Sequence, residues 1–475
     1  MNNDLVIANG LVVNATGRKH AHVVVNGGLV TEVIGGSAPV PEADRVIDAT
    51  GLLVLPGGVD GHCHIAQQTG AYHSKDDYAT ATRAALAGGT TTVLDFGIPA
   101  NASQTPLQAA EYKLSLVDQA RCDVALHASV VAWDESVPTQ LEIMADWGIR
   151  SVKLYATNRG TTMADPDTMI RVLHEMARLD GLAYVHAEHD GIIVDCTERH
   201  AADGRIGIEH LPATRPQLAE EASVKEVLSM AEYTGAAVYF VHLSTPDAVD
   251  LVFAAKSQGV QAYSETCPHY VALDDSVYAG PLPEYYACCP PMRDRETMLA
   301  LRESLNAGKI DTVASDHSCY DLEQKREHTE DIRLMPHGLP GVETRLPVTF
   351  SHMVDENLEG LERFVSVFST APARLNALRG KGAIAPGFDA DVVLIDPTVR
   401  KQVAGADLHM GTDFTPFEGI TLRGWPHTVL RSGTVVLDRK GFTDPGAVGR
   451  VLAQEPFSEA LRWPALGAPH FQQVS

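Results

Sequence analysis

Eight short apolar runs, separated by segments long enough for helices, constrain the fold of this chain more than any other feature. The runs are rich in β-branched and aromatic residues, as buried parallel strands are. Strands that alternate with helices in this way predict an α/β fold, and eight such units predict a (β/α)8 TIM barrel. The predicted strands are Leu52–Leu55, Thr91–Phe96, Val124–Val130, Ser151–Tyr155, Ala183–His186, Val238–His242, Ala262–Glu265 and Thr312–Ser315.

The two ends of the chain have a different pattern, in which short β-rich runs are separated by turn residues. Asn-Gly pairs between such runs are typical of tight hairpins, so we expect turns at Asn9-Gly10 and at Asn26-Gly27-Gly28. Runs of the same kind return in Ala390–Asp396 and Thr428–Val436. The sequence therefore predicts that both ends build one small domain.

A chain of 475 residues exceeds the roughly 250–300 residues at which single cores stop growing. We therefore expect two domains. The larger is a catalytic barrel of residues 55–377, and the smaller is a β-sandwich composed of residues 1–54 and 378–475.

The composition excludes several kinds of partner. The formal net charge of −24 disfavours nucleic acid and anionic membranes, because both would repel the protein. Seven cysteines without a CxxC pattern fit reduced thiols. The first residues, Met1 to Asp4, lack the features of a signal peptide, and no apolar run approaches the roughly 18 residues of a membrane span. We expect a soluble, cytoplasmic protein.

Candidate metal ligands occur where the predicted strands end, which is where TIM barrels place their active sites. His62 and His64 are separated by one residue, so both imidazoles would lie on the same face of a strand. One such residue at a strand end has an ordinary structural explanation, but a set at five strand ends points to a single site. The candidates are His62, His64, Lys153, His186, His242 and Asp316.

Four histidines and one aspartate are more ligands than one catalytic ion with an open position requires. They indicate two divalent ions, and imidazole with carboxylate suits Zn²⁺ or a similar ion. Lys153 is costly on a buried strand unless its charge is removed or paired. Carboxylation by CO₂ would convert it into an anionic ligand that bridges the ions.

Stretches along nearly the whole chain match a known pattern in order and spacing. They are Pro56–His64, Ser151–Lys153, Val185–Glu188, Val241–His242, Glu265–Tyr270, Cys289–Arg293, Ala314–His317, Pro336–Glu343, Lys381–Gly387, Asp389–Asp391 and Pro416–Gly419. With these stretches the chain resembles the amidohydrolase superfamily. Within it, the chain resembles the cyclic amidases, namely dihydropyrimidinases (hydantoinases), dihydroorotases and allantoinases.

The resemblance implies a site and a reaction. His62, His64 and Asp316 would hold one ion, His186 and His242 the second, and carboxylated Lys153 would bridge them. A metal-bridging hydroxide would attack the carbonyl of a small cyclic amide, and Asp316 would pass its proton to the departing ring nitrogen. The resemblance also implies a homotetramer.

The residues that would determine which cyclic substrate binds differ from the family pattern. Dihydroorotases usually carry an arginine two residues after the histidine pair, where this chain has Ala66, so we disfavour a carboxylate-bearing ring. By resemblance to dihydropyrimidinases, Cys289 and His337 would contact the substrate, partly through their backbone. The tyrosine expected five residues after Lys153 is replaced by Asn158, so either Tyr155 or Asn158 would stabilise the oxyanion.

Alternative functions remain open at this point. Allantoinase is the nearest one, and dihydroorotase is a weaker one. A mononuclear deaminase would not need Lys153, and a scaffold protein related to dihydropyrimidinases would have lost ligands that are all present here. We expect His73, His189, His269 and His317 to lie behind the metal ligands or in solvent rather than to bind metal.

Overall fold

The computed structural model describes residues 3–101 and 103–463. One sheet is the predicted barrel, whose neighbouring strands are all parallel and follow the order β15-β14-β13-β12-β11-β10-β9-β6-β16. The predicted α/β barrel is thereby confirmed. Its strands are β6 (Gly58–His64), β9 (Thr90–Gly97), β10 (Asp123–Ser129), β11 (Ser151–Tyr155), β12 (Leu182–His186), β13 (Ala237–Phe240), β14 (Ala262–Thr266), β15 (Thr312–Val313) and β16 (His317–Ser318).

The eighth barrel strand is broken into β15 and β16. The first piece pairs with β14, and the second pairs with β6 and so closes the barrel, with His317 opposite Cys63. The break between the pieces, Ala314–Asp316, contains one of the predicted metal ligands.

The prediction that Leu52–Leu55 is the first barrel strand is wrong. That run is β5 (Leu53–Pro56), which pairs with β1 and β17 of the other large sheet, whereas the barrel begins at β6. Both runs are buried on both faces, so periodicity alone cannot tell to which sheet each belongs.

Two glycines carry the chain from one sheet to the other. The Gly57 N–H donates to Asp391 O of the small domain at 2.8 Å, and the Gly58 N–H donates to Gly89 O of the barrel at 2.9 Å. A Cβ atom on Gly57 would lie 2.2 Å from the hydroxyl oxygen of Thr91. Only glycine permits this close approach of the two sheets.

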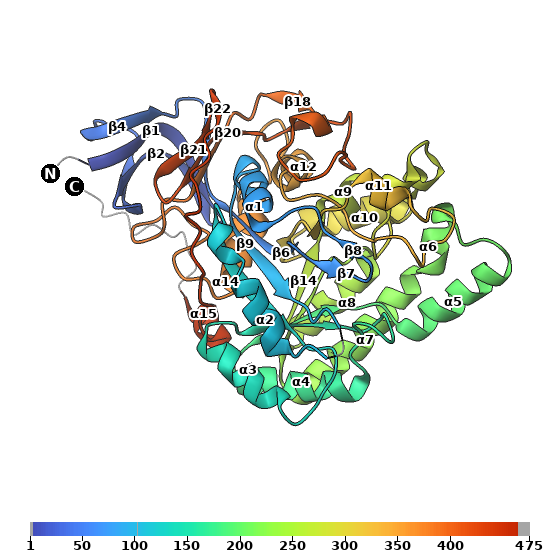
Figure 1. Ribbon diagram of the computed structural model, residues 1–475. Helices are drawn as coiled ribbons and strands as arrows, with labels where there is room; N and C mark the ends of the chain where they lie inside the picture. Colours follow the sequence, from blue (N-terminus) through green and yellow to red (C-terminus); the bar gives the residue numbers. More distant parts are fainter. Residues whose placement is uncertain (1–2, 102, 464–475) are drawn as a thin grey trace.

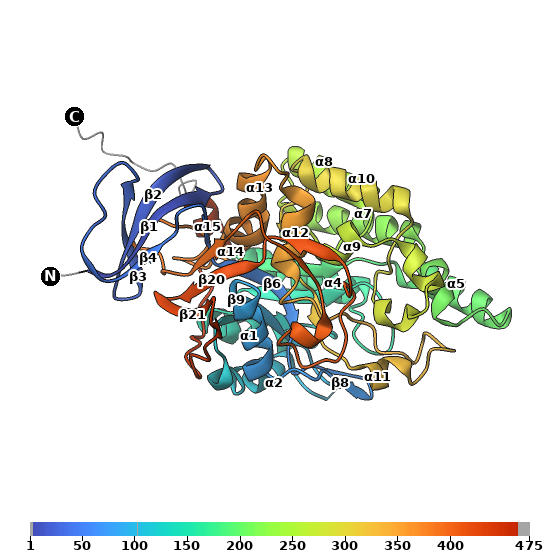
Figure 2. The ribbon, with the colours of Figure 1, turned by 90° about the horizontal axis from the view of Figure 1, so that it is seen from above.

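The second large sheet combines strands from both ends of the chain, in the order β22-β21-β20-β17-β5-β1-β2-β3, with β4 beside β1. Figures 1 and 2 show these blue and red strands side by side at one end of the molecule. The strands are β1 (Asn3–Asn14), β2 (Gly17–Asn26), β3 (Leu29–Gly35), β4 (Ala43–Asp48), β5, β17 (Val392–Ile395), β20 (Pro426–Arg431), β21 (Thr434–Asp438) and β22 (Gly441–Phe442).

Of the two predicted hairpins at the N-terminus, one is confirmed. Asn26-Gly27-Gly28 joins β2 to β3, but Asn9-Gly10 lies inside β1 at a bulge, where Asn9 has φ 65°. A Cβ on Gly10 would lie 2.3 Å from a methyl group of Val54, so this glycine serves strand packing rather than a turn.

Helices surround the barrel, and α5 extends away from its rim (Figure 1). The helices are α1 (Tyr78–Ala87), α2 (Pro106–Leu114), α3 (Val137–Asp146), α4 (Pro166–Arg178), α5 (Asp190–Ala202), α6 (Leu211–Thr214), α7 (Gln217–Thr234), α8 (Pro246–Ser257), α9 (Pro268–Ala272), α10 (Arg295–Asn306), α11 (Leu322–Arg326), α12 (Arg345–Met353), α13 (Leu361–Val365), α14 (Ala371–Leu375) and α15 (Phe457–Arg462). Two-stranded pairs are formed by β7 (Gln68–Thr69) with β8 (Tyr72–His73) and by β18 (Arg400–Gln402) with β19 (Thr421–Arg423).

Within residues 3–101 and 103–463, no helix has the length and apolar character needed to cross a membrane. All seven cysteines are free thiols. The domain boundaries at residues 54/55 and 377/378 stay a prediction, and residues 1–2 and 464–475 of the predicted small domain lie outside the described chain.

A buried ion cluster joins the two large sheets. Lys381 Nζ lies 2.6 Å from Asp123 Oδ2 at the start of β10, 2.6 Å from Asp391 Oδ2 beside β17, and 2.9 Å from Asp389 Oδ2. Although burial opposes its charge, the carboxylates raise the pKa of Lys381 above its ordinary value. One ammonium therefore joins carboxylates that belong to both sheets, and Arg431 and Arg450 bind Asp123 as well.

We predict that Lys381→Met lowers the free energy of unfolding by about 3–5 kcal/mol, because it leaves the buried Asp391 carboxylate without its cation. Chemical denaturation followed by tryptophan fluorescence measures this change. Arg379→Met, which removes a surface pair with Glu455, serves as the control and leaves the midpoint unchanged. Equal stability of the two variants would contradict the role of the cluster.

Candidate metal centre

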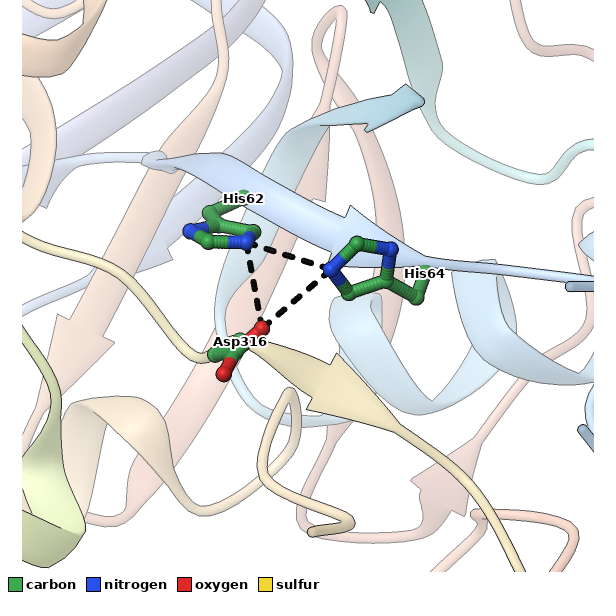
Figure 3. Close-up of side chains that lie close together, drawn as sticks. All are labelled: His62, His64 and Asp316. Carbon is green, nitrogen blue, oxygen red and sulfur yellow. Dashed lines mark hydrogen bonds and ion pairs between the residues drawn. The ribbon is translucent and has the colours of Figure 1, made fainter. Parts of the chain in front are cut away.

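The first three predicted ligands converge at the top of the barrel. His62 and His64 are on one face of β6, and Asp316 lies in the break before β16. The Nε2 atoms of His62 and His64 are 3.2 Å apart, and Asp316 Oδ1 lies 3.1 Å from the first and 3.3 Å from the second. Figure 3 shows the three side chains pointing toward one another. Their potential ligand atoms therefore surround one point.

The other two predicted histidines form a second group beside the first. His186 ends β12, His242 follows β13, and both are buried. His186 Nδ1 and His242 Nε2 are 2.9 Å apart. The ring of His242 also lies near that of His62, with 5.6 Å between the centroids. The two groups are thus neighbours in one site.

Lys153 is on β11 and is only 1% exposed. Its ammonium lies 4.9 Å from the ring centroid of Phe96 and 5.2 Å from that of Tyr155. Burial lowers the pKa of Lys153 to about 8, although the charge of Asp316 acts in the opposite direction. Lys153 therefore loses its proton at a lower pH than an exposed lysine does.

Buried carboxylates hold the outward-facing nitrogens of two ligands. His62 Nδ1 donates to Glu265 Oε1 at 2.8 Å, and His186 Nε2 donates to Glu188 Oε2 at 2.7 Å. This network assigns lone pairs to His62 Nε2 and His186 Nδ1, the atoms that face the other ligands. A cation among these lone pairs and the Asp316 carboxylate would be attracted by all of them. The donor set therefore fits Zn²⁺ or a similar divalent ion.

Two ligands adopt a backbone conformation that is uncommon for non-glycine residues. Asp316 has φ 49° and His242 has φ 40°. Such residues cost about 1–3 kcal/mol each and persist only where their surroundings fix them. The Ser315 N–H donates to Asp60 Oδ1 at 3.0 Å, and the His242 N–H donates to Glu265 Oε1 at 3.0 Å. These bonds hold both ligands at the site.

The two candidates for the oxyanion donor have very different surroundings. The ring of Tyr155 is buried and its centroid lies 5.7 Å from that of His186. Asn158 is exposed in the following loop, where its side-chain amide donates to Thr162 Oγ1 at 3.3 Å. The structure brings Tyr155, and not Asn158, to the predicted metal ligands.

The two predicted substrate contacts touch each other. Cys289 Sγ lies 2.8 Å from His337 Nδ1, and both residues are half-buried. Burial raises the pKa of the Cys289 thiol to about 12, so the thiol is protonated at neutral pH. A protonated thiol is a poor nucleophile, so Cys289 is not a good candidate for nucleophilic catalysis.

Comparison with known proteins identifies the family. The model of the amidohydrolase family matches residues 53–436. The chain is similar to a D-hydantoinase of Ralstonia pickettii, with 32% identity over 460 residues, which cover 96% of this chain and 100% of that protein. A D-hydantoinase of Rhizobium radiobacter is 33% identical over 439 residues, covering 92% and 95% of the two chains. The chain belongs to the amidohydrolase family.

A solved structure supports the same assignment for this amidohydrolase. The D-hydantoinase (dihydropyrimidinase) from Thermus sp. superimposes with a TM-score of 0.91 and 31% identity, covering 95% of this chain and 99% of that one. The predicted barrel fold and the predicted membership in the hydantoinase-like cyclic amidases are confirmed. The enzyme is a metal-dependent cyclic amidohydrolase, and neither a deaminase nor a scaffold protein is favoured.

Sequence reasoning gave no role to the residues that hold the ligands of this amidohydrolase. Glu265 is buried on β14 and accepts a bond from Tyr239 Oη at 2.7 Å on its other oxygen. Glu188 is bound by Arg215, with 3.1 Å between Nε and Oε1. A buried acidic residue at the end of a barrel strand was the available signal for Glu265, but its partner comes from a distant segment.

His317 follows Asp316, and the prediction that it does not bind metal stays a prediction. Its Nε2 lies 2.8 Å from Asp76 Oδ2, and its Nδ1 accepts a bond from the Gly341 N–H at 3.1 Å. Both ring nitrogens are therefore used within the protein.

We predict that Glu265→Gln weakens the affinity of the amidohydrolase for Zn²⁺ by about 10–100-fold, because a neutral amide makes the His62 imidazole less basic. Competition with a chromophoric chelator measures this affinity. Glu142→Gln, at a surface pair with Arg178, is the control and leaves it unchanged. An unaltered affinity in Glu265→Gln would show that the carboxylate does not act on the centre.

Proposed function

We propose that this cyclic amidohydrolase opens the ring of a 5-substituted hydantoin or a dihydropyrimidine by hydrolysing a ring amide C–N bond. The observation that carries the proposal is the convergence of His62, His64 and Asp316 with His186 and His242. Relatives that are named for D-hydantoinase activity and match nearly the whole chain support the choice of ring. The product would be an N-carbamoyl amino acid.

The proposed centre contains two divalent ions, most simply Zn²⁺. His62, His64 and Asp316 would hold one ion, His186 and His242 the other, and carboxylated Lys153 would bridge them. When bound, the ions would supply Lewis-acid polarisation of the carbonyl and a lowered pKa of water.

Two residues of the chain would serve the reaction itself. Asp316 Oδ1 faces the point between His62 and His64, where its carboxylate can accept the proton of the attacking water and return it to the leaving nitrogen. Tyr155, beside His186, would donate its hydroxyl hydrogen to the oxyanion that develops on the carbonyl. Cys289 and His337 would line the ring.

Dihydroorotate is a poor candidate substrate. Ala66 stands where an arginine would bind its carboxylate, and the net charge of −24 would repel an anion. The homotetramer and the cytoplasmic location that the sequence predicts remain proposals, as do zinc and the modification of Lys153.

Turnover of a panel of rings tests the function. The metal-loaded enzyme is incubated with dihydrouracil, 5-substituted hydantoins, allantoin, dihydroorotate and cyclic imides, and the ring-opened acid is quantified. We expect opening of hydantoins or dihydrouracil and none of dihydroorotate. A protein that holds two ions per chain and opens no ring would overturn the proposal.

Asp316→Asn is expected to lower kcat by at least about 100-fold, because the amide cannot shuttle the proton. Metal analysis of the same preparation shows whether ions remain. Full turnover by this variant would remove Asp316 from the proton transfer.

The carboxylation of Lys153 predicts a dependence on pH and CO₂. Only the neutral amine reacts with CO₂, forming a C–N bond and releasing a proton, and the pKa of Lys153 is about 8. At a constant concentration of dissolved CO₂, the rate of reactivation of the metal-free enzyme with zinc should therefore fall about tenfold per pH unit below that value and level off above it. Lys153→Ala is the control, and equal rates with and without bicarbonate would contradict the modification.

A further inference from the structure

Lys325 on α11 is fully buried without serving the metal centre. In the part of the chain that the structure describes, no carboxylate lies within ion-pair distance of its ammonium. Its Nζ instead donates to three backbone carbonyl oxygens, those of Ala287 at 2.8 Å, Pro336 at 3.1 Å and Gly338 at 2.6 Å. An ammonium has three N–H donors, so all of them are used.

The three carbonyls belong to two irregular segments that are far apart in sequence. Ala287 precedes Cys289, and Pro336 and Gly338 flank His337. The Gly338 N–H also donates to Ala287 O at 2.9 Å. Neither segment is paired in a sheet at these positions, so Lys325 supplies the donors that strands would otherwise provide.

The side chains that these segments carry form one wall of the site. Cys289 Sγ and His337 Nδ1 are 2.8 Å apart. His337 Nε2 is buried and has no hydrogen-bond partner among the described residues. Since a buried polar atom normally has a partner, this nitrogen has the properties of a group that meets a substrate amide or carbonyl.

The same wall lies next to the metal centre. The Ser318 N–H donates to Leu339 O at 2.9 Å, and the Gly341 N–H binds the ring of His317. The segment that follows His337 therefore runs along β16, directly after Asp316. A shift of this segment would move the wall relative to the predicted metal ligands, and those ligands would all stay in place.

We propose that Lys325 positions the wall formed by Cys289 and His337 and thereby sets how tightly the enzyme binds its cyclic amide. The inference rests on the proposed function, because a ring amide is the ligand that this wall would contact. Lys325 touches neither the ligand atoms nor the reacting bond, so it is a positioning residue. Arginine could not replace it, because a planar guanidinium cannot direct three bonds from one nitrogen.

The test compares Lys325→Met and Lys325→Gln with an enzyme that keeps Lys325. All three proteins are loaded with zinc and carry Cys196→Ser, which removes the other thiol that is not fully buried. We expect KM for the best substrate of the ring panel to rise about tenfold or more, while kcat changes by less than about threefold and metal content stays the same. Lys225→Met, at an exposed pair on α7, is the matched control and keeps the wild-type KM.

A second measurement does not depend on turnover. The alkylation rate of Cys289 by iodoacetamide, followed by mass spectrometry of its peptide, reports the contact between Cys289 and His337. We expect this rate to rise about fivefold or more in the Lys325 variants, because a loosened wall exposes the thiol. Unchanged KM and unchanged labelling would overturn the proposal.

The remaining outcomes also decide the question. Loss of metal from the Lys325 variants would contradict the proposal, since it would place the lysine in the support of the metal centre. Failure of both variants to fold would contradict it too, because the lysine would then be a general folding determinant. If the wild-type enzyme opens no ring, the proposed function fails, while the labelling rates still show whether Lys325 positions the wall.

Discussion

The convergence of potential metal-ligand atoms is the constraint on which the site depends. His62 Nε2 lies 3.1 Å from Asp316 Oδ1, and His186 Nδ1 lies 2.9 Å from His242 Nε2. The Asp316 side chain is 14% exposed, and the three histidines are buried. A cation among these atoms would be attracted by all of them, and the attraction is stronger where burial lowers the effective dielectric constant. The parallel barrel meets this constraint by bringing strand ends to one rim, so that residues distant in sequence become neighbours.

The rest of the molecule fixes that rim in place. Glu265 binds the ring of His62 and the backbone of His242 with one oxygen, and so connects the two groups of ligands. Asp60 holds the backbone beside Asp316, where the eighth strand breaks. Lys325 acts in the same way on the substrate side, with backbone carbonyls in place of ligands. Buried polar side chains such as these strongly favour one geometry of the site, because in any other geometry they would lack hydrogen-bond partners.

The sequence predicted the barrel and the six candidate metal residues because both follow from local pattern. Apolar runs specify buried strands, and polar residues at their ends specify the rim. It assigned Leu52–Leu55 to the wrong sheet, since burial on both faces looks the same in either sheet. It also missed the roles of Glu265 and Lys325. Their partners lie in other strands and loops, and no spacing along the chain encodes such contacts.

The central claim is that the two groups of ligands hold two ions in one site. Anomalous X-ray scattering from crystals of the zinc-loaded enzyme, recorded at the zinc edge, tests it most directly. The account predicts two peaks, one among His62, His64 and Asp316 and one beside His186 and His242, with electron density extending beyond Lys153 Nζ toward both. A single peak, or peaks away from these residues, would contradict it.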